Sequence, residues 1–362
     1  MMTIHPLHAG DGYLYLTRQV ASGDRVRDRT RDLTEYYVDT GTPPGIWMGS
    51  GAEKLGLTGQ VTEAQMAALF GEGLHPDADA IIAREITAGK TVKQAIDAAK
   101  LGASFAEYTT QPSPITDLFD TAVEAFTATE RRRPSWDERA TLRWDAARDH
   151  LTGTLGRAPS NTEIDSALAK EQAVSRKAVA GMDCVFTPPK SISILWGLGS
   201  DQIREAILRC HREAVRETLA WAESQCAVTR RGRNGVRQID TEGLVIAAFE
   251  HFDNRVGDMN LHTHPVISGK VLGVDGKWSA LDARPLFASG VSLSCRYNAT
   301  IVGKIRRQIG FRFRAPCPRP RQATGPRGSR DRGRDDHRVL PHPRHHRPHR
   351  TTCCGLPRRP RP

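Results

Sequence analysis

Three histidines are spaced in a way that could let them bind one metal ion together. His262 and His264 are separated by one residue, and ten residues separate His251 from His262. Side chains two apart on a β-strand point to the same side, roughly 6.5–7 Å from one another, and a neighbouring strand could bring His251 beside them. Three converging neutral imidazoles form a ligand set for a divalent cation that acts as a Lewis acid on a phosphate. The alternative is a surface pair of histidines on a strand, with His251 unrelated.

A carboxylate, Asp183, lies within the otherwise apolar segment 182–186. Burying a carboxylate is unfavourable unless it is paired. It could accept a hydrogen bond from the far nitrogen of a metal-bound histidine, which would fix the tautomer of that ring. It could also act as the base for a nucleophile. The alternative is an aspartate at a strand edge that forms an ion pair with Arg or Lys.

Four of the six tyrosines lie near the N-terminus: Tyr13, Tyr15, Tyr36 and Tyr37. Tyrosine can attack phosphorus, but its phenol has an ordinary pKa of about 10, so a metal or a base must help to generate the phenolate. Taken by themselves, these four tyrosines are better interpreted as amphipathic core or interface residues than as nucleophiles.

The elements that must position these side chains follow from the apolar periodicity. Alternation over 182–186 predicts a strand with Asp183 on the face opposite Met182, Cys184 and Phe186. Further strands are predicted over 244–252 and 262–267, and Asp275-Gly276 predicts a hairpin. Long helices are predicted over 201–225 and 291–308. The pattern predicts an α+β fold in which long helices lie to one side of an antiparallel sheet.

The first 180 residues combine a starting strand with a long helical region. Thr3-Ile4 opens the strand. Residues 61–180 are rich in Ala, Glu, Arg and Leu, and we predict that they are mostly helical. Val92, Ala95, Ile96 and Ala99 recur at helical spacing, and Asn161 marks a helix start.

The net charge of +11 is concentrated in the last 48 residues. Residues 315–362 hold thirteen arginines, three aspartates and no Lys or Glu, a net charge of +10, so the rest of the chain carries only +1. DNA binding by the body must therefore come from local charge. This Arg/Pro/His-rich tail has almost no large apolar residues and is predicted to be disordered. It is either a basic DNA-binding arm or an accidental reading frame after a frameshift; the loss of all Lys and Glu favours the second.

Several functional classes are not supported by the sequence. The seven cysteines show no zinc-ligand spacing, so we expect reduced, mostly buried thiols in the body. No apolar run is long enough for a membrane span, and no signal peptide is evident, so we expect a cytoplasmic protein. Gly89-Lys-Thr lacks the upstream glycine of a phosphate-binding loop, so an ATP-driven helicase is not expected.

Four stretches together resemble the TrwC/TraI type of conjugative relaxase, the MobF class of the HUH endonucleases. They lie in order over residues 1–314, which we take as a relaxase domain. They are Tyr13-Leu-Tyr with Glu35-Tyr-Tyr-Val; Trp47-Met-Gly-Ser-Gly-Ala-Glu-Lys-Leu-Gly-Leu-Thr-Gly; Asp183-Cys-Val-Phe-Thr-Pro-Pro-Lys-Ser-Ile-Ser; and His251 through His262-Thr-His264 with Gly276-Lys-Trp.

The resemblance implies a palm-like antiparallel sheet covered by helices. It implies that His251, His262 and His264 bind a divalent metal, Mg²⁺ or Mn²⁺ with Zn²⁺ as an alternative. An N-terminal tyrosine would then attack single-stranded or hairpin DNA at an origin of transfer, leaving a 5′-phosphotyrosyl end, and relaxosome accessory and coupling proteins would be partners. A second tyrosine, from Tyr36–Tyr37, would serve strand termination or re-joining. The resemblance also implies that Asp183 supports the tyrosine or a metal-binding histidine. It further implies that Lys190 and Ser191 belong to a loop that lies near the DNA.

Two departures leave questions open. Leu14 separates Tyr13 from Tyr15 where the family often has adjacent tyrosines, so the sequence does not decide which is the nucleophile. The helical region of about 75–180 is longer than in compact relatives and is expected to be an insertion. Two other functions compete with a truncated relaxase: a metallohydrolase using the same histidines on another substrate, and a non-catalytic DNA-binding remnant.

Overall fold

The computed structural model describes residues 1–18, 43–108, 113–174, 176–254 and 258–311. All of these described residues belong to one compact unit. The predicted disordered tail, together with Tyr36 and Tyr37, lies outside the described residues.

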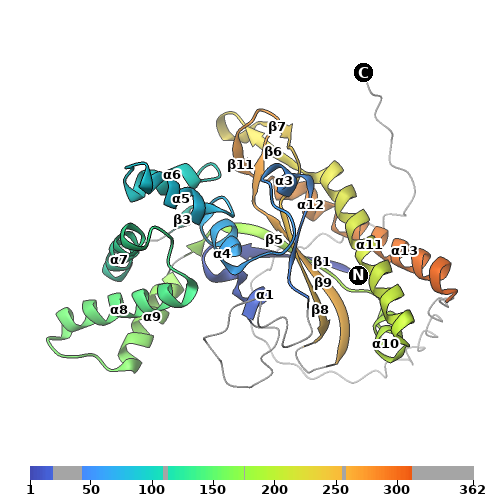
Figure 1. The fold of residues 1–362 in the computed structure, drawn as a ribbon, viewed down its shortest axis with the longest axis horizontal. Helices are drawn as coiled ribbons and strands as arrows, with labels where there is room; N and C mark the ends of the chain where they lie inside the picture. The colour runs from blue at the N-terminus through green and yellow to red at the C-terminus, as the bar shows by residue number, and fades with distance from the viewer. Residues whose placement is uncertain (19–42, 109–112, 175, 255–257, 312–362) are drawn as a thin grey trace, which may run out of the picture. The chain divides into compact units, whose positions relative to one another are not determined.

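A five-stranded antiparallel sheet positions the candidate residues (Figure 1). Its strand order is β1-β5-β9-β8-β2, so β5, β9 and β8 lie in the interior while β1 and β2 form the edges. All three strands predicted from the sequence around the candidate residues are present. The bounds are β1 Met2–His8, β2 Ile46–Met48, β5 Val179–Phe186, β8 Ile246–Asp253 and β9 Met259–Ser268.

The described helices agree with the predicted helical regions. The helices predicted over 201–225 and 291–308 are α11 and α13, and that predicted from Asn161 is α9. The bounds are α1 Leu14–Arg18, α3 Ser50–Lys54, α4 Glu63–Met66, α5 Ala78–Thr87, α6 Val92–Ala99, α7 Pro114–Glu130, α8 Trp136–Leu155, α9 Asn161–Val174, α10 Lys190–Leu198, α11 Asp201–Cys226, α12 Ala283–Ala288 and α13 Gly290–Ile309.

Short helices and three two-stranded ribbons complete the described fold. The predicted Asp275-Gly276 hairpin joins β10 to β11, and Gly276 has the positive φ that the turn requires. The short helical segments are η1 Asp11–Tyr13, η2 Ala67–Glu72 and η3 Arg233–Gly235. The ribbons pair β3 Glu107–Tyr108 with β4 Arg176–Lys177, β6 Val228–Arg231 with β7 Arg237–Asp240, and β10 Lys270–Leu272 with β11 Trp278–Ala280.

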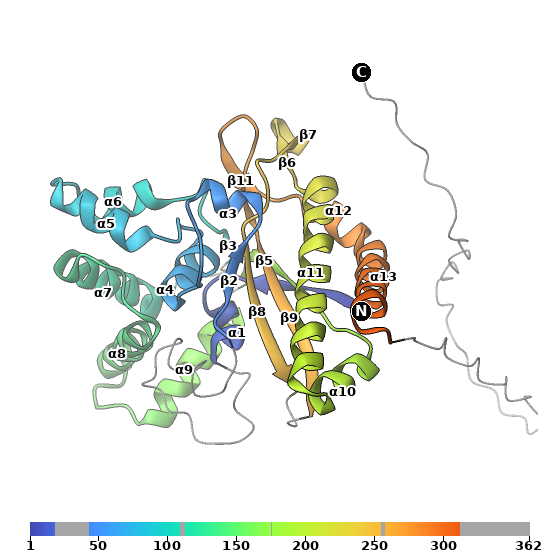
Figure 2. The ribbon, with the colours of Figure 1, turned by 45° about the vertical axis from the view of Figure 1, so that its right-hand side comes forward.

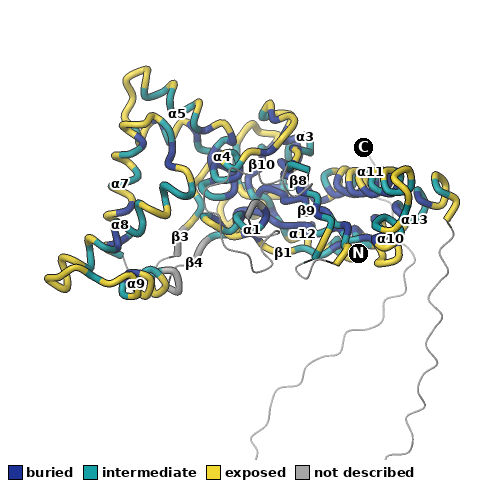
Figure 3. The backbone as a smooth tube through the Cα atoms, turned by 60° about the horizontal axis from the view of Figure 1, so that its bottom comes forward, coloured by how far each residue is buried: buried dark blue, intermediate teal, exposed yellow. Residues whose placement is uncertain are grey.

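Strand alternation divides the sheet into two faces, and the long helices cover one of them, as predicted (Figure 2). Met182, Cys184 and Phe186 of β5 pack in a core with residues of α11 and α13. Asp183 lies between them in the strand and therefore points to the other face. The interior strands β5, β8 and β9 are buried along much of their length, as the dark blue stretches in Figure 3 show.

Shorter segments cover the second face. Leu69 and Phe70 of the π-helical η2 pack there with Tyr13, Leu16 and apolar residues of β8 and β9. Gly181 of β5 allows this close approach, because a Cβ at that position would lie 3.1 Å from the Phe70 ring and 2.5 Å from the carbonyl oxygen of Ile267. This packing holds η1 and α1, and with them Tyr13 and Tyr15, over the face on which Asp183 points.

A buried arginine side chain joins the helical region between η2 and β5 to η2 itself. The side chain of Arg133, 5% exposed, contacts Asp79 at 2.9 Å and Glu72 at 3.5 Å. The connection between α7 and α8 is thereby held against α5 and η2. The predicted insertion, residues 75–180, contains α5 to α9, although its last two residues already belong to β5. Within the described ranges, no helix is both long and apolar enough to cross a membrane.

Candidate metal centre and tyrosine site

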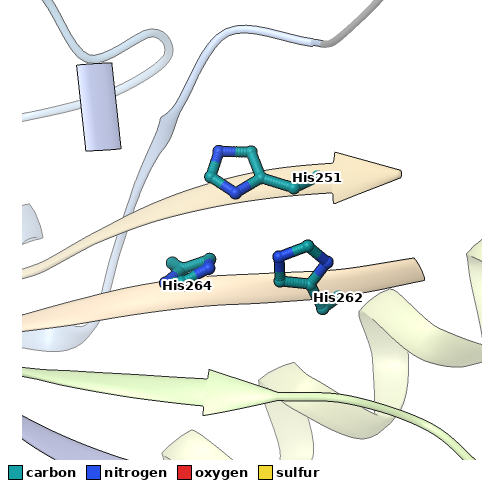
Figure 4. Close-up of side chains that lie close together, drawn as sticks. All are labelled: His251, His262 and His264. Carbon is teal, nitrogen blue, oxygen red and sulfur yellow. The ribbon is translucent and has the colours of Figure 1, made fainter. Parts of the chain in front are cut away.

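The neighbouring strands β8 and β9 bring the three histidines together on the second face of the sheet (Figure 4). His251 pairs with His262 in register, and His264 follows two residues later on the same side of β9. The ring centroids are 4.9–5.3 Å apart. One ligand atom from each ring can be chosen so that all three lie within 4.8 Å of one another. This separation is suited to three nitrogens that share one cation.

The chemistry of the donor set fits a divalent cation. His251 is 1% exposed, and among the described residues neither of its ring nitrogens has a hydrogen-bond partner. Burial lowers the pKa of His251 to about 2 and also lowers the pKa of His262, so both rings are neutral at pH 7. A buried imidazole without partners is unfavourable, whereas a neutral imidazole nitrogen is a good ligand for a divalent metal.

The two outer histidines are oriented by hydrogen bonds on their Nδ1 atoms. Nδ1 of His262 lies 2.6 Å from the carbonyl oxygen of Asn260, and Nδ1 of His264 lies 2.9 Å from Oδ2 of Asp183. Both acceptors require a proton on Nδ1, which leaves the lone pair on Nε2 of each ring. This is the arrangement in which an acceptor fixes the tautomer of a metal-binding histidine.

Asp183 links this cluster to one of the two early tyrosines. It is 3% exposed, and the Tyr15 hydroxyl donates a hydrogen bond to its Oδ2 across 2.5 Å. The ring of Tyr15 also lies edge-on to that of His264, with 6.4 Å between the centroids. Burial, followed by the charge of Asp183, raises the pKa of Tyr15 well above its ordinary value. The phenol is therefore protonated at neutral pH while no cation is near, and its proton is already directed at a carboxylate.

Tyr13 has different surroundings. It is 3% exposed and packs in the second-face core, where a Cβ on Gly71 would lie 3.6 Å from its ring. Burial, followed by the charge of Glu63, raises its pKa. Tyr13 ends η1, and Tyr15 is the second residue of α1. Because each helical residue turns by about 100°, the two side chains point roughly 200° apart around the axis. The structure thus brings Tyr15, and not Tyr13, into contact with Asp183.

Lys190 and Ser191 require a correction. The family resemblance implies a loop here, but the two residues form the first turn of α10. Pro189, with a φ of −50°, is the N-cap residue, where its missing N–H removes no hydrogen bond from the helix. Both side chains are exposed, and Nζ of Lys190 donates to the carbonyl oxygen of Met259 across 2.6 Å.

A basic ribbon was not predicted from the sequence. The β6–β7 hairpin carries four arginines, Arg230, Arg231, Arg233 and Arg237, around an Asn-Gly turn. Asp282 pairs with Arg230 and Asp275 pairs with Arg231. Arg233 and Arg237 are exposed and form no ion pair within the described ranges. Because residues 1–314 carry almost no net charge, these four arginines beside an Asn-Gly turn could have indicated a basic hairpin from the sequence alone.

Comparisons with known proteins show what this chain is similar to. The sequence model of one family, described as TrwC relaxase, matches residues 9–325. The multifunctional conjugation protein TraI of Escherichia coli is 31% identical over 170 residues, which cover 46% of this chain and 9% of TraI. The aligned segment thus spans about a tenth of that relative.

Solved structures of the conjugative relaxase TrwC in complex with OriT DNA are also similar. A copper-bound form has a TM-score of 0.47 at 22% identity, and a form described as metal-bound has a TM-score of 0.46 at 21% identity. Both alignments cover 87% of this chain and 72% of TrwC.

Proposed function

Because the chain belongs to the TrwC relaxase family, a family of DNA-nicking enzymes, we propose that it cleaves one strand of single-stranded or hairpin DNA by transesterification onto Tyr15. In this role it would initiate conjugative plasmid transfer at an origin of transfer. One observation supports the assignment of Tyr15 above all: its hydroxyl reaches Asp183, and Asp183 also contacts the histidine cluster through His264.

The residues fit the requirements of phosphoryl transfer. His251, His262 and His264 would hold a divalent cation, Mg²⁺ or Mn²⁺ with Zn²⁺ as an alternative, which supplies positive charge to polarise the scissile phosphate. Asp183 accepts the phenol proton while the Tyr15 oxygen bonds to phosphorus and the bond from phosphorus to the 3′ oxygen breaks. The products are a 5′-phosphotyrosyl DNA and a free 3′-hydroxyl, which takes its proton from solvent.

The DNA would be held by local charge, because residues 1–314 carry a net charge of only +1. The β6–β7 ribbon offers the exposed guanidinium groups of Arg233 and Arg237, which suit phosphates and base edges. Lys190 and Ser191 at the start of α10 are further DNA-binding candidates, since α10 packs against β9, the strand of two histidines. A second nucleophile from Tyr36–Tyr37, relaxosome accessory and coupling proteins, and a cytoplasmic location remain predictions.

Capture of DNA tests the proposal. The full chain is incubated with labelled single-stranded oligonucleotides in Mg²⁺ or Mn²⁺ and analysed by denaturing electrophoresis. We expect a protein–DNA adduct that disappears in excess chelator and returns with added metal. Cleavage without an adduct would indicate a metallohydrolase, and binding without cleavage would indicate a non-catalytic remnant. An adduct that persists in excess chelator would contradict the role of the histidines.

A further inference from the structure

A chain of buried polar groups lies on the face of β9 opposite the histidine cluster. His211 of α11 is 0% exposed and has a partner at each ring nitrogen. Its Nε2 lies 2.7 Å from Oγ1 of Thr263, and its Nδ1 lies 2.7 Å from the hydroxyl of Tyr297 on α13. We call Thr263, His211 and Tyr297 the relay. It connects β9 to α11 and α13 through an otherwise apolar core.

Thr263 is the residue between His262 and His264. Because successive strand side chains point to opposite faces, Thr263 points toward the long helices while its two neighbours point toward His251. The hydrogen bond between His211 and Thr263 therefore holds the strand directly behind the two outer histidines. A rotation of β9 about its own axis would break this bond and would turn both imidazoles away from His251.

The relay differs from the local hydrogen bond of a buried threonine on α11. Thr218, also 0% exposed, hydrogen-bonds to the carbonyl oxygen of Ala214 in its own helix, and its hydroxyl links α11 to no other described element. In the relay, by contrast, each hydrogen bond crosses between elements and constrains direction as well as distance. Apolar residues could fill the same volume, but they would leave the strand free to rotate slightly.

We propose that His211 is a positioning residue for the metal centre, which it serves by fixing the rotation of β9 through Thr263. Metal sites tolerate errors of only about 0.2 Å in ligand distance, and side-chain packing alone holds a strand less firmly than a directional bond. The inference rests on the proposed metal centre. It adds that the precision of this centre is set from the opposite face of the sheet.

Cobalt binding tests the inference without the DNA reaction. Co²⁺ is titrated into the full chain, and the dissociation constant and the visible absorption spectrum of the bound ion are measured. Thr263→Val keeps the size and strand preference of the side chain but removes the hydroxyl. We expect Co²⁺ to bind this variant about tenfold more weakly than the wild type, with an altered spectrum. Thr263→Ser, which restores the hydroxyl, should return both properties toward the wild type.

Two further variants separate positioning from general loosening. His211→Gln should weaken Co²⁺ binding in the same direction as Thr263→Val. Thr218→Val removes a buried hydroxyl from the same helix, and we expect it to lower the melting temperature with no change in Co²⁺ affinity or spectrum. If Thr218→Val weakens binding as much as Thr263→Val does, the positioning role is overturned.

Co²⁺ binding by the wild type distinguishes a failure of the proposed metal centre from a failure of the positioning role. If it binds no Co²⁺, the metal centre itself is wrong and the positioning role falls with it. If it binds Co²⁺ and folded Thr263→Val binds equally well with the same spectrum, only the positioning role is overturned.

Discussion

Oδ2 of Asp183 lies 2.5 Å from the Tyr15 hydroxyl and 2.9 Å from Nδ1 of His264. One buried carboxylate thus contacts both the candidate nucleophile and a candidate metal ligand. It can accept the phenol proton and orient the imidazole at the same time. Substitutions at Tyr15 and at Asp183 should therefore have different effects on DNA cleavage and on metal binding.

Replacing Tyr15 by Phe should abolish the covalent DNA adduct, because the variant keeps the ring but lacks the attacking oxygen. Tyr13→Phe is the matched control, since it removes a hydroxyl from a buried tyrosine two residues away. We expect Tyr13→Phe to retain most adduct formation in the oligonucleotide assay. Loss of the adduct in Tyr13→Phe together with its retention in Tyr15→Phe would reverse the assignment.

Asp183→Asn should slow adduct formation by about 10²- to 10⁴-fold, the range of a general base. The variant should also bind metal about 10- to 100-fold more weakly, because His264 loses its charged acceptor. Measuring single-turnover rates at saturating metal separates the two effects. A rate restored to the wild-type value by metal alone would show that Asp183 orients the histidine and does not act as a base.

Metal should stabilise the fold through His251. Ligand present at a hundred times its dissociation constant adds about 2.7 kcal/mol to the free energy of unfolding, so Mn²⁺ should raise the melting temperature of the wild type. His251→Leu should show no such rise. Without metal, the variant should be about as stable as the wild type, since it also loses two buried nitrogens without partners. A large metal-free destabilisation would argue that His251 is a structural residue.

Arg233→Ala combined with Arg237→Ala should weaken DNA binding and make it less dependent on salt. Removing one interaction between an arginine and a phosphate of single-stranded DNA reduces the slope of log K against log salt by about 0.7. Binding is measured by fluorescence anisotropy at several salt concentrations. Arg157→Ala, which removes an exposed arginine paired with Glu163 in another part of the chain, is the control and should leave the slope unchanged. Equal slopes in all variants would exclude the ribbon as a phosphate-binding element.

Acid should destabilise the protein through His211. Burial, followed by electrostatic interactions with His262, Arg212 and the amino terminus, lowers the pKa of His211 to about 3. Between pH 6.5 and about 3 the unfolded chain therefore binds a proton that the folded protein does not, and stability falls as the pH falls. The loss is about 1.4 kcal/mol for each pH unit.

The difference between the wild type and His211→Gln isolates this contribution. Free energies of unfolding are measured in chelator from pH 7 to pH 4.5. We expect the wild-type curve to fall more steeply than that of His211→Gln by the equivalent of one proton. Parallel curves would mean that His211 is protonated in the folded state.

The sequence by itself was sufficient to predict the framework of the site. The period-two alternation around Asp183 and the one-residue spacing of His262 and His264 determine which side chains share a face of a strand. The short connection between β8 and β9 makes them neighbours, so His251 could be expected beside His262. The long helices α11 and α13 and the hairpin at Asp275-Gly276 were equally predictable, because periodicity and turn chemistry are local properties.

Only the tertiary structure distinguished between Tyr15 and Tyr13. Both lie in a short helical segment without apolar periodicity of its own, and its orientation is set by η2 packing against Gly181 of β5. The relay has the same origin, since His211 and Thr263 are 52 residues apart and meet only because α11 packs on β9. Contacts of this kind depend on how whole elements pack together, and no local pattern in the sequence encodes the direction from which a distant side chain arrives.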